Sequence, residues 1–287
     1  MRSVLMKLAV PAIVSLASCA NATGGTDPSS GIDYPTDPSQ LILRLSYEGG
    51  FVPIDWTLTA LPQFSLYGDG TLITGGAQVA IYPGPALPPV IRRSVSPEGV
   101  RAILEAAFAA GLGERDIETS ETGQLLIADA PTAVFTLTAE GRTTTASVYA
   151  LGELTERPDG MSDREFEVRT QLARFAERLT NLEGWLPAGS VGPEEPFEAS
   201  SARIFVGRYR AQEDLEQEPV TWPIGDLETF GEPTTTFPEL RCGVVAGPDW
   251  GTLRRAAADA NQLTPWVSAG ARRQVLLRPL LPDESGC

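Results

Sequence analysis

Hydrophobic and polar positions along this chain follow two periodicities, one typical of strands and one typical of helices. Residues 41–47, 64–73 and 90–95 are rich in apolar and β-branched side chains with an alternating pattern, so we predict a strand in each of the outer ranges and a pair of strands in 64–73. Asp69-Gly70 indicates a two-residue hairpin turn there, because both central positions of such a turn need positive φ.

A second hairpin is predicted around Glu140-Gly141, with strands 133–139 and 142–151 on either side. A two-residue turn places Ala139 opposite Arg142 and Phe135 opposite Ala146. The paired strands then have one apolar face and one face of hydroxyl side chains. The apolar face contains Ala133, Phe135, Leu137, Ala146 and Val148, and the other contains Val134, Thr136, Thr138, Thr143, Thr145 and Ser147.

Two amphipathic helices complete the first half of the chain. Ser96-Pro97-Glu98 combines an N-cap, a proline at the first helical position and an acid in the first turn. Ser162 and Glu165 have the spacing of a capping box. The two apolar faces are expected to pack on the sheet; they contain Val100, Ile103, Leu104, Ala107 and Phe108, and Val168, Leu172, Phe175, Leu179 and Leu182.

The second half repeats this mixture on a smaller scale. Residues 202–209, 241–246 and 272–278 read as strands, and a helix is expected from Pro248-Asp249 to Asn261. The stretch 187–201 has the composition of a linker. The predicted fold class is therefore α+β: an antiparallel sheet with packed helices in 40–186, the linker, and a smaller disulfide-braced α+β module in 202–287.

The amino-terminal residues have a different character. Arg2 and Lys7 precede an apolar run over 8–16 that is too short to span a bilayer, which is the layout of a secretory signal. Residues 20–39 are rich in Gly, Ser, Thr, Pro and Asp, a composition that predicts a flexible tether.

Leu16-Ala17-Ser18-Cys19 resembles the lipobox of bacterial lipoproteins. This resemblance implies a signal peptide over 1–18, cleavage before Cys19 and lipidation of its thiol, so that the chain is held on the extracytoplasmic face of the cell membrane. Two or more acyl chains suffice for stable anchoring. Ala20-Asn21-Ala22 also fits an ordinary cleavage site, which would give a secreted protein without lipid.

The carboxyl-terminal sequence LTPWVSAGARRQVLLRPLLPDE is also informative. Together with YGDG and AIYPGPALPP it resembles an uncharacterised family of lipoproteins from high-GC, actinobacterial-type bacteria. The resemblance covers the mature chain and implies no activity.

Composition excludes several kinds of chemistry. The 287 residues contain no histidine, and the one lysine is Lys7 in the leader. Histidine triads, histidine zinc sites, Schiff-base lysines and P-loop lysines are therefore excluded. The chain has 37 acidic and 22 basic residues, a net charge of −15, and loss of Arg2 and Lys7 makes it −17. Such a charge disfavours nucleic acid as a partner.

The chain has three cysteines, one in the lipobox-like sequence and two near the carboxyl end. If Cys19 takes lipid, Cys242 and Cys287 remain, and outside the cytoplasm we expect a disulfide between them. Two free thiols are the alternative.

Three functions remain open. The first is a membrane-anchored module that binds a protein of the cell envelope. The second is a lipoprotein that binds a small molecule or glycan, either in a pocket between the two parts or through exposed tryptophans or the hydroxyl face. The third is an envelope hydrolase with two carboxylates. No catalytic motif, metal ligand set or cofactor site is predicted, and the candidate tryptophans are Trp185, Trp222, Trp250 and Trp266.

Overall fold

The computed structural model describes residues 31–78, 80–119 and 127–287. Ile32–Cys287 forms one compact unit. Within the described residues the fold is α+β, with two mostly antiparallel sheets and few helices, which confirms the predicted class.

The first sheet has the strand order β5-β7-β6-β1-β2-β3-β4-β8, and only β5 pairs in parallel with its neighbour. Its strands are β1 (Leu41–Gly49), β2 (Phe64–Tyr67), β3 (Thr71–Gly75), β4 (Val90–Ser94), β5 (Ile117–Thr119), β6 (Pro131–Ala139), β7 (Arg142–Tyr149) and β8 (Glu195–Pro196). Strand β1 is central and pairs with both β2 and β6.

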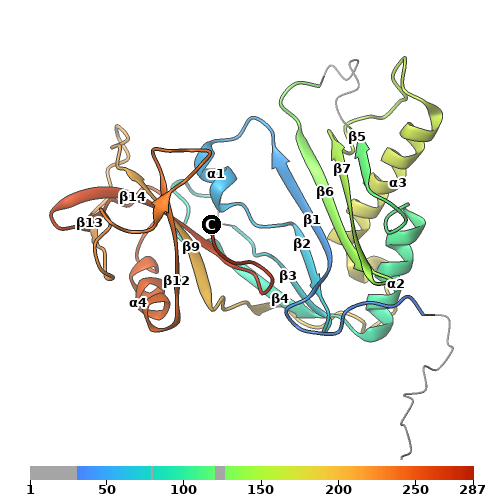
Figure 1. Ribbon diagram of the computed structural model, residues 1–287, viewed down its shortest axis with the longest axis horizontal. Helices are drawn as coiled ribbons and strands as arrows, with labels where there is room; N and C mark the ends of the chain where they lie inside the picture. Colours follow the sequence, from blue (N-terminus) through green and yellow to red (C-terminus); the bar gives the residue numbers. More distant parts are fainter. Residues whose placement is uncertain (1–30, 79, 120–126) are drawn as a thin grey trace, which may run out of the picture. The chain divides into compact units, whose positions relative to one another are not determined.

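Two helices cover one face of this sheet, α2 (Pro97–Ala109) and α3 (Asp163–Thr180), and a short 3-10 turn, η1 (Leu182–Gly184), follows α3 (Figure 1). Leu104, Phe135, Leu172 and Phe175 are among the buried residues of this layer, and the rings of Phe135 and Phe175 stack at 6.1 Å. The predicted apolar faces of both helices therefore pack on the predicted apolar face of the sheet.

Of the two predicted two-residue hairpins, the structure confirms the one between β6 and β7 and contradicts the one between β2 and β3. Ala139 pairs with Arg142 and Phe135 with Ala146, as the two-residue turn requires. The turn between β2 and β3 was wrongly predicted: the strands pair so that Gly68, Asp69 and Gly70 form a three-residue loop. Only Gly70 has positive φ, at 81°. Gly68 is required for another reason, since an added Cβ would lie 2.4 Å from the carbonyl oxygen of Asp37.

The second sheet has the order β10-β13-β14-β9-β12-β11. Its strands are β9 (Ser201–Arg208), β10 (Val220–Thr221), β11 (Glu232–Pro233), β12 (Arg241–Ala246), β13 (Trp266–Ser268) and β14 (Ala271–Pro279). Helix α4 (Gly247–Ala257) packs on it and ends before the predicted Asn261. A separate hydrophobic cluster that includes Trp222, Trp250 and Trp266 fills this half.

Two segments that the sequence predicts to be a linker and a flexible tether contact the first sheet. Strand β8, inside 187–201, pairs with the outer edge of β4. Ile32 and Tyr34, in the predicted tether, pack against the first hydrophobic cluster, and the Asp33 N–H donates to a carboxylate oxygen of Glu140 at 2.8 Å. These apolar and hydrogen-bonding contacts hold both segments on the sheet.

Candidate functional site

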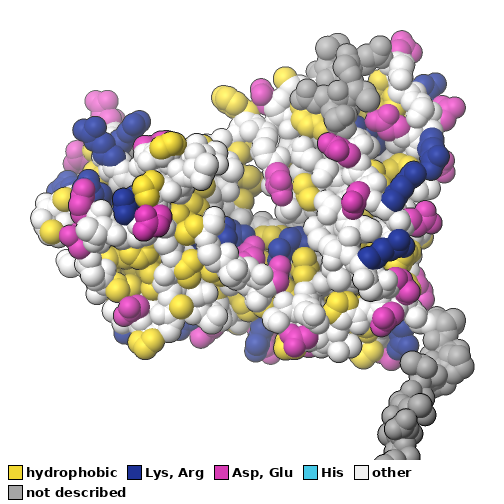
Figure 2. Space-filling view, viewed as in Figure 1, with side chains coloured by type: hydrophobic (Ala, Val, Ile, Leu, Met, Phe, Trp, Pro, Cys, Tyr) yellow, Lys and Arg dark blue, Asp and Glu magenta, His cyan; other side chains and the backbone are white. Residues whose placement is uncertain are grey.

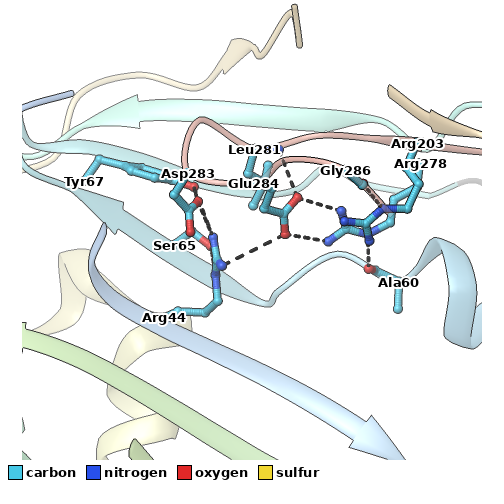
Figure 3. A network of polar contacts seen from close by, with 10 residues as sticks. All are labelled: Arg44, Ala60, Ser65, Tyr67, Arg203, Arg278, Leu281, Asp283, Glu284 and Gly286. Atoms are coloured by element: carbon cyan, nitrogen blue, oxygen red, sulfur yellow. Dashed lines mark hydrogen bonds and ion pairs between the residues drawn. The ribbon is translucent and has the colours of Figure 1, made fainter. Parts of the chain in front are cut away.

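A cluster of charged side chains joins the carboxyl-terminal segment to the first sheet (Figure 3). Arg44 on β1 donates from Nη2 to Oδ1 of Asp283 at 2.8 Å, and the Tyr67 hydroxyl on β2 donates to the same oxygen at 2.8 Å. Arg44 also donates from Nε to the Ser65 hydroxyl at 3.2 Å. Two residues far apart in sequence are thus held together in a largely buried ion pair.

Glu284 makes the second half of this cluster. Its two carboxylate oxygens accept hydrogen bonds from Nη1 and Nη2 of Arg278, at 2.6 and 2.8 Å, and one of them also accepts from the N–H of Leu281. Arg278 donates from Nε to the carbonyl of Ala60 at 3.0 Å. Arg203, the direct cross-strand neighbour of Arg278, donates to the carbonyl of Gly286. Glu284 therefore lies beside two neighbouring positive charges.

The electrostatics of the cluster suit structural support. Burial alone raises the pKa of Glu284, but the hydrogen bonds and charge of Arg278, with help from Leu281 and Arg44, outweigh it and hold that pKa below the ordinary glutamate value. Burial raises the pKa of Tyr67, and its hydrogen bond to Asp283 raises it further. A carboxylate held ionised by arginine is a poor proton donor. Glu284 thus lacks the raised pKa that the acid of a two-carboxylate hydrolase requires.

A disulfide closes the same carboxyl-terminal segment. Cys242 on β12 and Cys287 are bonded, with their Cα atoms 6.0 Å apart, which confirms the predicted pairing. Together with the pairs formed by Asp283 and Glu284, it fastens the carboxyl-terminal segment at residues 283, 284 and 287.

An exposed apolar surface lies on the connection between β1 and β2. It consists of Phe51, Val52, Ile54 and Trp56, with exposed fractions of 87, 39, 36 and 50%. We call it the 51–56 surface. Helix α1 (Ile54–Thr59) carries its last two residues, and Pro53 occupies the N-cap. Monomeric proteins rarely expose apolar side chains in a contiguous group without a function.

The inner side of α1 explains why Trp56 faces outward. Oδ2 of Asp55 accepts a hydrogen bond from the Gln274 amide at 2.7 Å, and Leu58 packs on the buried cluster of Phe205, Cys242 and Leu276. Burial raises the pKa of Asp55, and the bond from Gln274 counteracts this in part. Asp55 and Leu58 lie on the side of α1 that faces β14, whereas Trp56 lies on the opposite side and is half exposed.

The four tryptophans named as candidate sugar-binding residues pack inside the protein or against a neighbouring side chain. Trp222, Trp250 and Trp266 are buried in the second hydrophobic cluster, and Trp185 is half-buried beneath the guanidinium of Arg178. None of the four presents an open ring surface for a sugar. Trp56, which sequence reasoning missed, is the tryptophan with an exposed fraction of 50%. Its signal in the sequence is an apolar run after Gly49-Gly50 that fits neither helical nor strand periodicity.

The hydroxyl face is present as predicted on β6 and β7. Thr136, Thr145 and Ser147 are half-buried, and the hydroxyls of Thr138 and Thr143 lie 3.0 Å apart across the hairpin.

A cavity of about 490 Å³ lies against α3. It is not the pocket between the two parts of the chain that the ligand-binding hypothesis calls for. Its walls come from α3, from the loop Ala150–Leu154 after β7 and from Tyr47 on β1. Such a volume is in the range of small-molecule sites.

Acidic side chains are scattered over the visible face of the molecule and form no single block (Figure 2). Within the described ranges, no group of three or more His, Cys, Asp or Glu side chains is arranged to hold a metal ion. In the same ranges no helix combines the length and apolarity needed to cross a membrane. Residues 1–18, Cys19 and the cleavage alternative at Ala20–Ala22 lie outside the described residues.

No protein family model, curated protein or solved structure matches the chain.

Proposed function

We propose that this chain is a lipoprotein, anchored through Cys19 on the extracytoplasmic face of the membrane, that binds another envelope protein through the 51–56 surface. The observation that carries the proposal is the exposure of Phe51 and Trp56, at 87 and 50%. Large aromatic side chains supply much of the binding energy in protein interfaces. The lipobox and the secretory leader support the location.

Charge indicates the kind of partner. The exposed Glu48 lies close in sequence to the 51–56 surface, and the chain as a whole has a net charge of −15. A partner with an apolar groove bordered by arginine or lysine complements both features, and opposite charge favours fast, specific association.

Site-specific photocrosslinking in cells tests the interaction. We expect a benzoylphenylalanine at position 51 of the full-length lipoprotein to give one protein adduct, and the same probe at the exposed Glu105 on α2 to give none. Trp56→Asp should reduce the adduct from position 51 about tenfold or more, since an interface aromatic contributes about 2 kcal/mol or more.

Ile81→Asp is the matched control, because Ile81 is also an exposed apolar residue, in the loop between β3 and β4. This variant should leave the adduct unchanged. Equal adducts from positions 51 and 105, or an adduct that persists in Trp56→Asp, would exclude the 51–56 surface as the interface.

The anchor has its own test. Cys19→Ala should move the protein from the membrane fraction to the soluble fraction, because no acyl chains remain to hold it. Fractionation followed by immunoblotting measures this, and metabolic labelling with a palmitate analogue should disappear in the same variant. A Cys19→Ala protein that stays with the membrane contradicts the proposed anchor.

A further inference from the structure

The cavity on α3 contains a feature that neither the interface nor the fold explains. Arg169 lines it and is only 4% exposed, yet its Nη2 atom has no hydrogen-bond partner among the described residues. The other nitrogens are engaged: Nη1 donates to the carbonyl of Tyr149 at 2.7 Å, and Nε to Glu165 at 3.3 Å. Buried polar groups are nearly always hydrogen-bonded, so Arg169 brings to the cavity wall a guanidinium that is only partly compensated by its neighbours.

A second arginine lies on the same wall one and a half turns along α3. Arg174 lines the cavity, is exposed, and has no ion-pair partner within the described part of the chain. Glu177 is the acidic residue of the lining, so the lining itself carries a net charge of +1 in a protein whose net charge is −15. Glu165 neutralises part of the charge of Arg169.

The remaining walls are mostly apolar. Leu151, Leu154, Phe166 and Ala173 contribute them, and Tyr47 adds a hydroxyl that stays neutral because burial raises its pKa. Sites for small molecules combine apolar walls of this kind with a few polar groups that orient the ligand.

We propose that this cavity binds a small amphipathic monocarboxylate, with the carboxylate beside Arg174 and the apolar body against Leu151, Leu154 and Phe166. Arg174 is accessible and donates hydrogen bonds directly to the carboxylate. Nη2 of Arg169 is shielded from solvent, so Arg169 contributes its positive charge to the site and makes no direct hydrogen bond to the ligand. The proposal does not depend on the 51–56 surface.

Octanoate is the probe, and octanol is its uncharged counterpart. Ile32–Cys287 forms one compact unit with both sheets and both hydrophobic clusters, so this segment is titrated by calorimetry and by saturation-transfer NMR. We expect saturable binding of octanoate and at least about tenfold weaker binding of octanol, the ratio that one charge-assisted hydrogen bond provides.

Arg174→Glu should weaken octanoate binding at least about tenfold and leave octanol binding unchanged. Arg164→Glu makes the same charge change at an exposed position of α3 outside the cavity, and should alter affinity less than about twofold at physiological salt. Ala173→Phe fills the cavity and should abolish binding of both probes. These variants spare Arg169, whose burial makes its replacement a risk to folding.

Three results would each overturn the proposal: equal affinity for octanoate and octanol, equal effects of Arg174→Glu and Arg164→Glu, or undiminished binding in Ala173→Phe. Absence of saturable octanoate binding would do so as well. Circular dichroism on each variant confirms that the fold is retained.

Discussion

Replacing Cys242 and Cys287 together by alanine should lower the free energy of unfolding by about 4 kcal/mol. The bond closes a loop with a sequence separation of 45, and the chain-entropy model assigns a stabilisation of that size to such a loop. The loop contains most of β12 together with α4, β13 and β14, so the unfolded chain gains freedom over these elements when the bond is lost.

Urea unfolding followed by tryptophan fluorescence measures this effect, since Trp222, Trp250 and Trp266 leave a buried cluster on unfolding. Reduced wild-type protein is the matched control, and its midpoint should fall close to that of the double variant. A loss below about 1 kcal/mol would contradict the chain-entropy account of this bond.

Glu284→Gln should destabilise the protein by about 3 kcal/mol at neutral pH. Arg278 and Arg203 lie directly opposite each other on β14 and β9, and like charges in that arrangement repel. Glu284 accepts two hydrogen bonds from Arg278, whose side chain is 8% exposed. Removing one partner of a buried pair leaves the other charge uncompensated, which typically costs 3–5 kcal/mol, or about 3 at this partly accessible site.

A surface pair provides the control for this measurement. Glu195→Gln breaks the pair with Arg92, in which both side chains are more than half exposed, and should cost less than about 1 kcal/mol. Similar losses of stability from Glu195→Gln and Glu284→Gln would show that the buried pair stabilises the fold no more than a surface pair does.

Acid should remove the difference between wild type and Glu284→Gln. Because the pKa of Glu284 is lower in the folded state than in the unfolded state, its contribution is fully present above the ordinary glutamate pKa near 4.5. The contribution is lost as the pH falls through the lower folded-state value. The urea midpoints of wild type and Glu284→Gln should therefore converge below pH 4.5. A difference between the two midpoints that stays constant down to the lowest pH at which the protein folds would contradict the stabilising role of ionised Glu284.

Local rules account for the parts of the fold that sequence predicts well. The Glu140-Gly141 turn fixes the register of β6 and β7 by itself, and Ser162 caps α3 by accepting from the N–H of Glu165. The second half of that capping box takes another form, because the Glu165 carboxylate pairs with Arg169 instead. Apolar periodicity then identifies which helical face meets the sheet.

The candidate sites depend on distant residues, and local patterns do not specify them. Arg44 and Asp283 are 239 positions apart, so neither neighbourhood indicates the other. Helix α1 has six residues, too few for a helical period to emerge, and its outward face follows from contacts with Gln274 and Leu58 on the inner side. The cavity on α3 likewise requires Tyr47 from β1 beside α3, a juxtaposition that only the folded chain provides.

The position of β9 in the second sheet has a consequence for the time course of folding. Both hydrogen-bonding neighbours of β9, strands β12 and β14, follow it in the sequence, and β14 comes near the carboxyl end. At a synthesis rate of roughly 5 to 20 residues per second, β9 emerges several seconds before its second neighbour exists. Its apolar residues Ile204 and Val206 and both of its open edges must be shielded during that interval. We therefore expect the nascent chain to be a client of holding chaperones until β14 has been made.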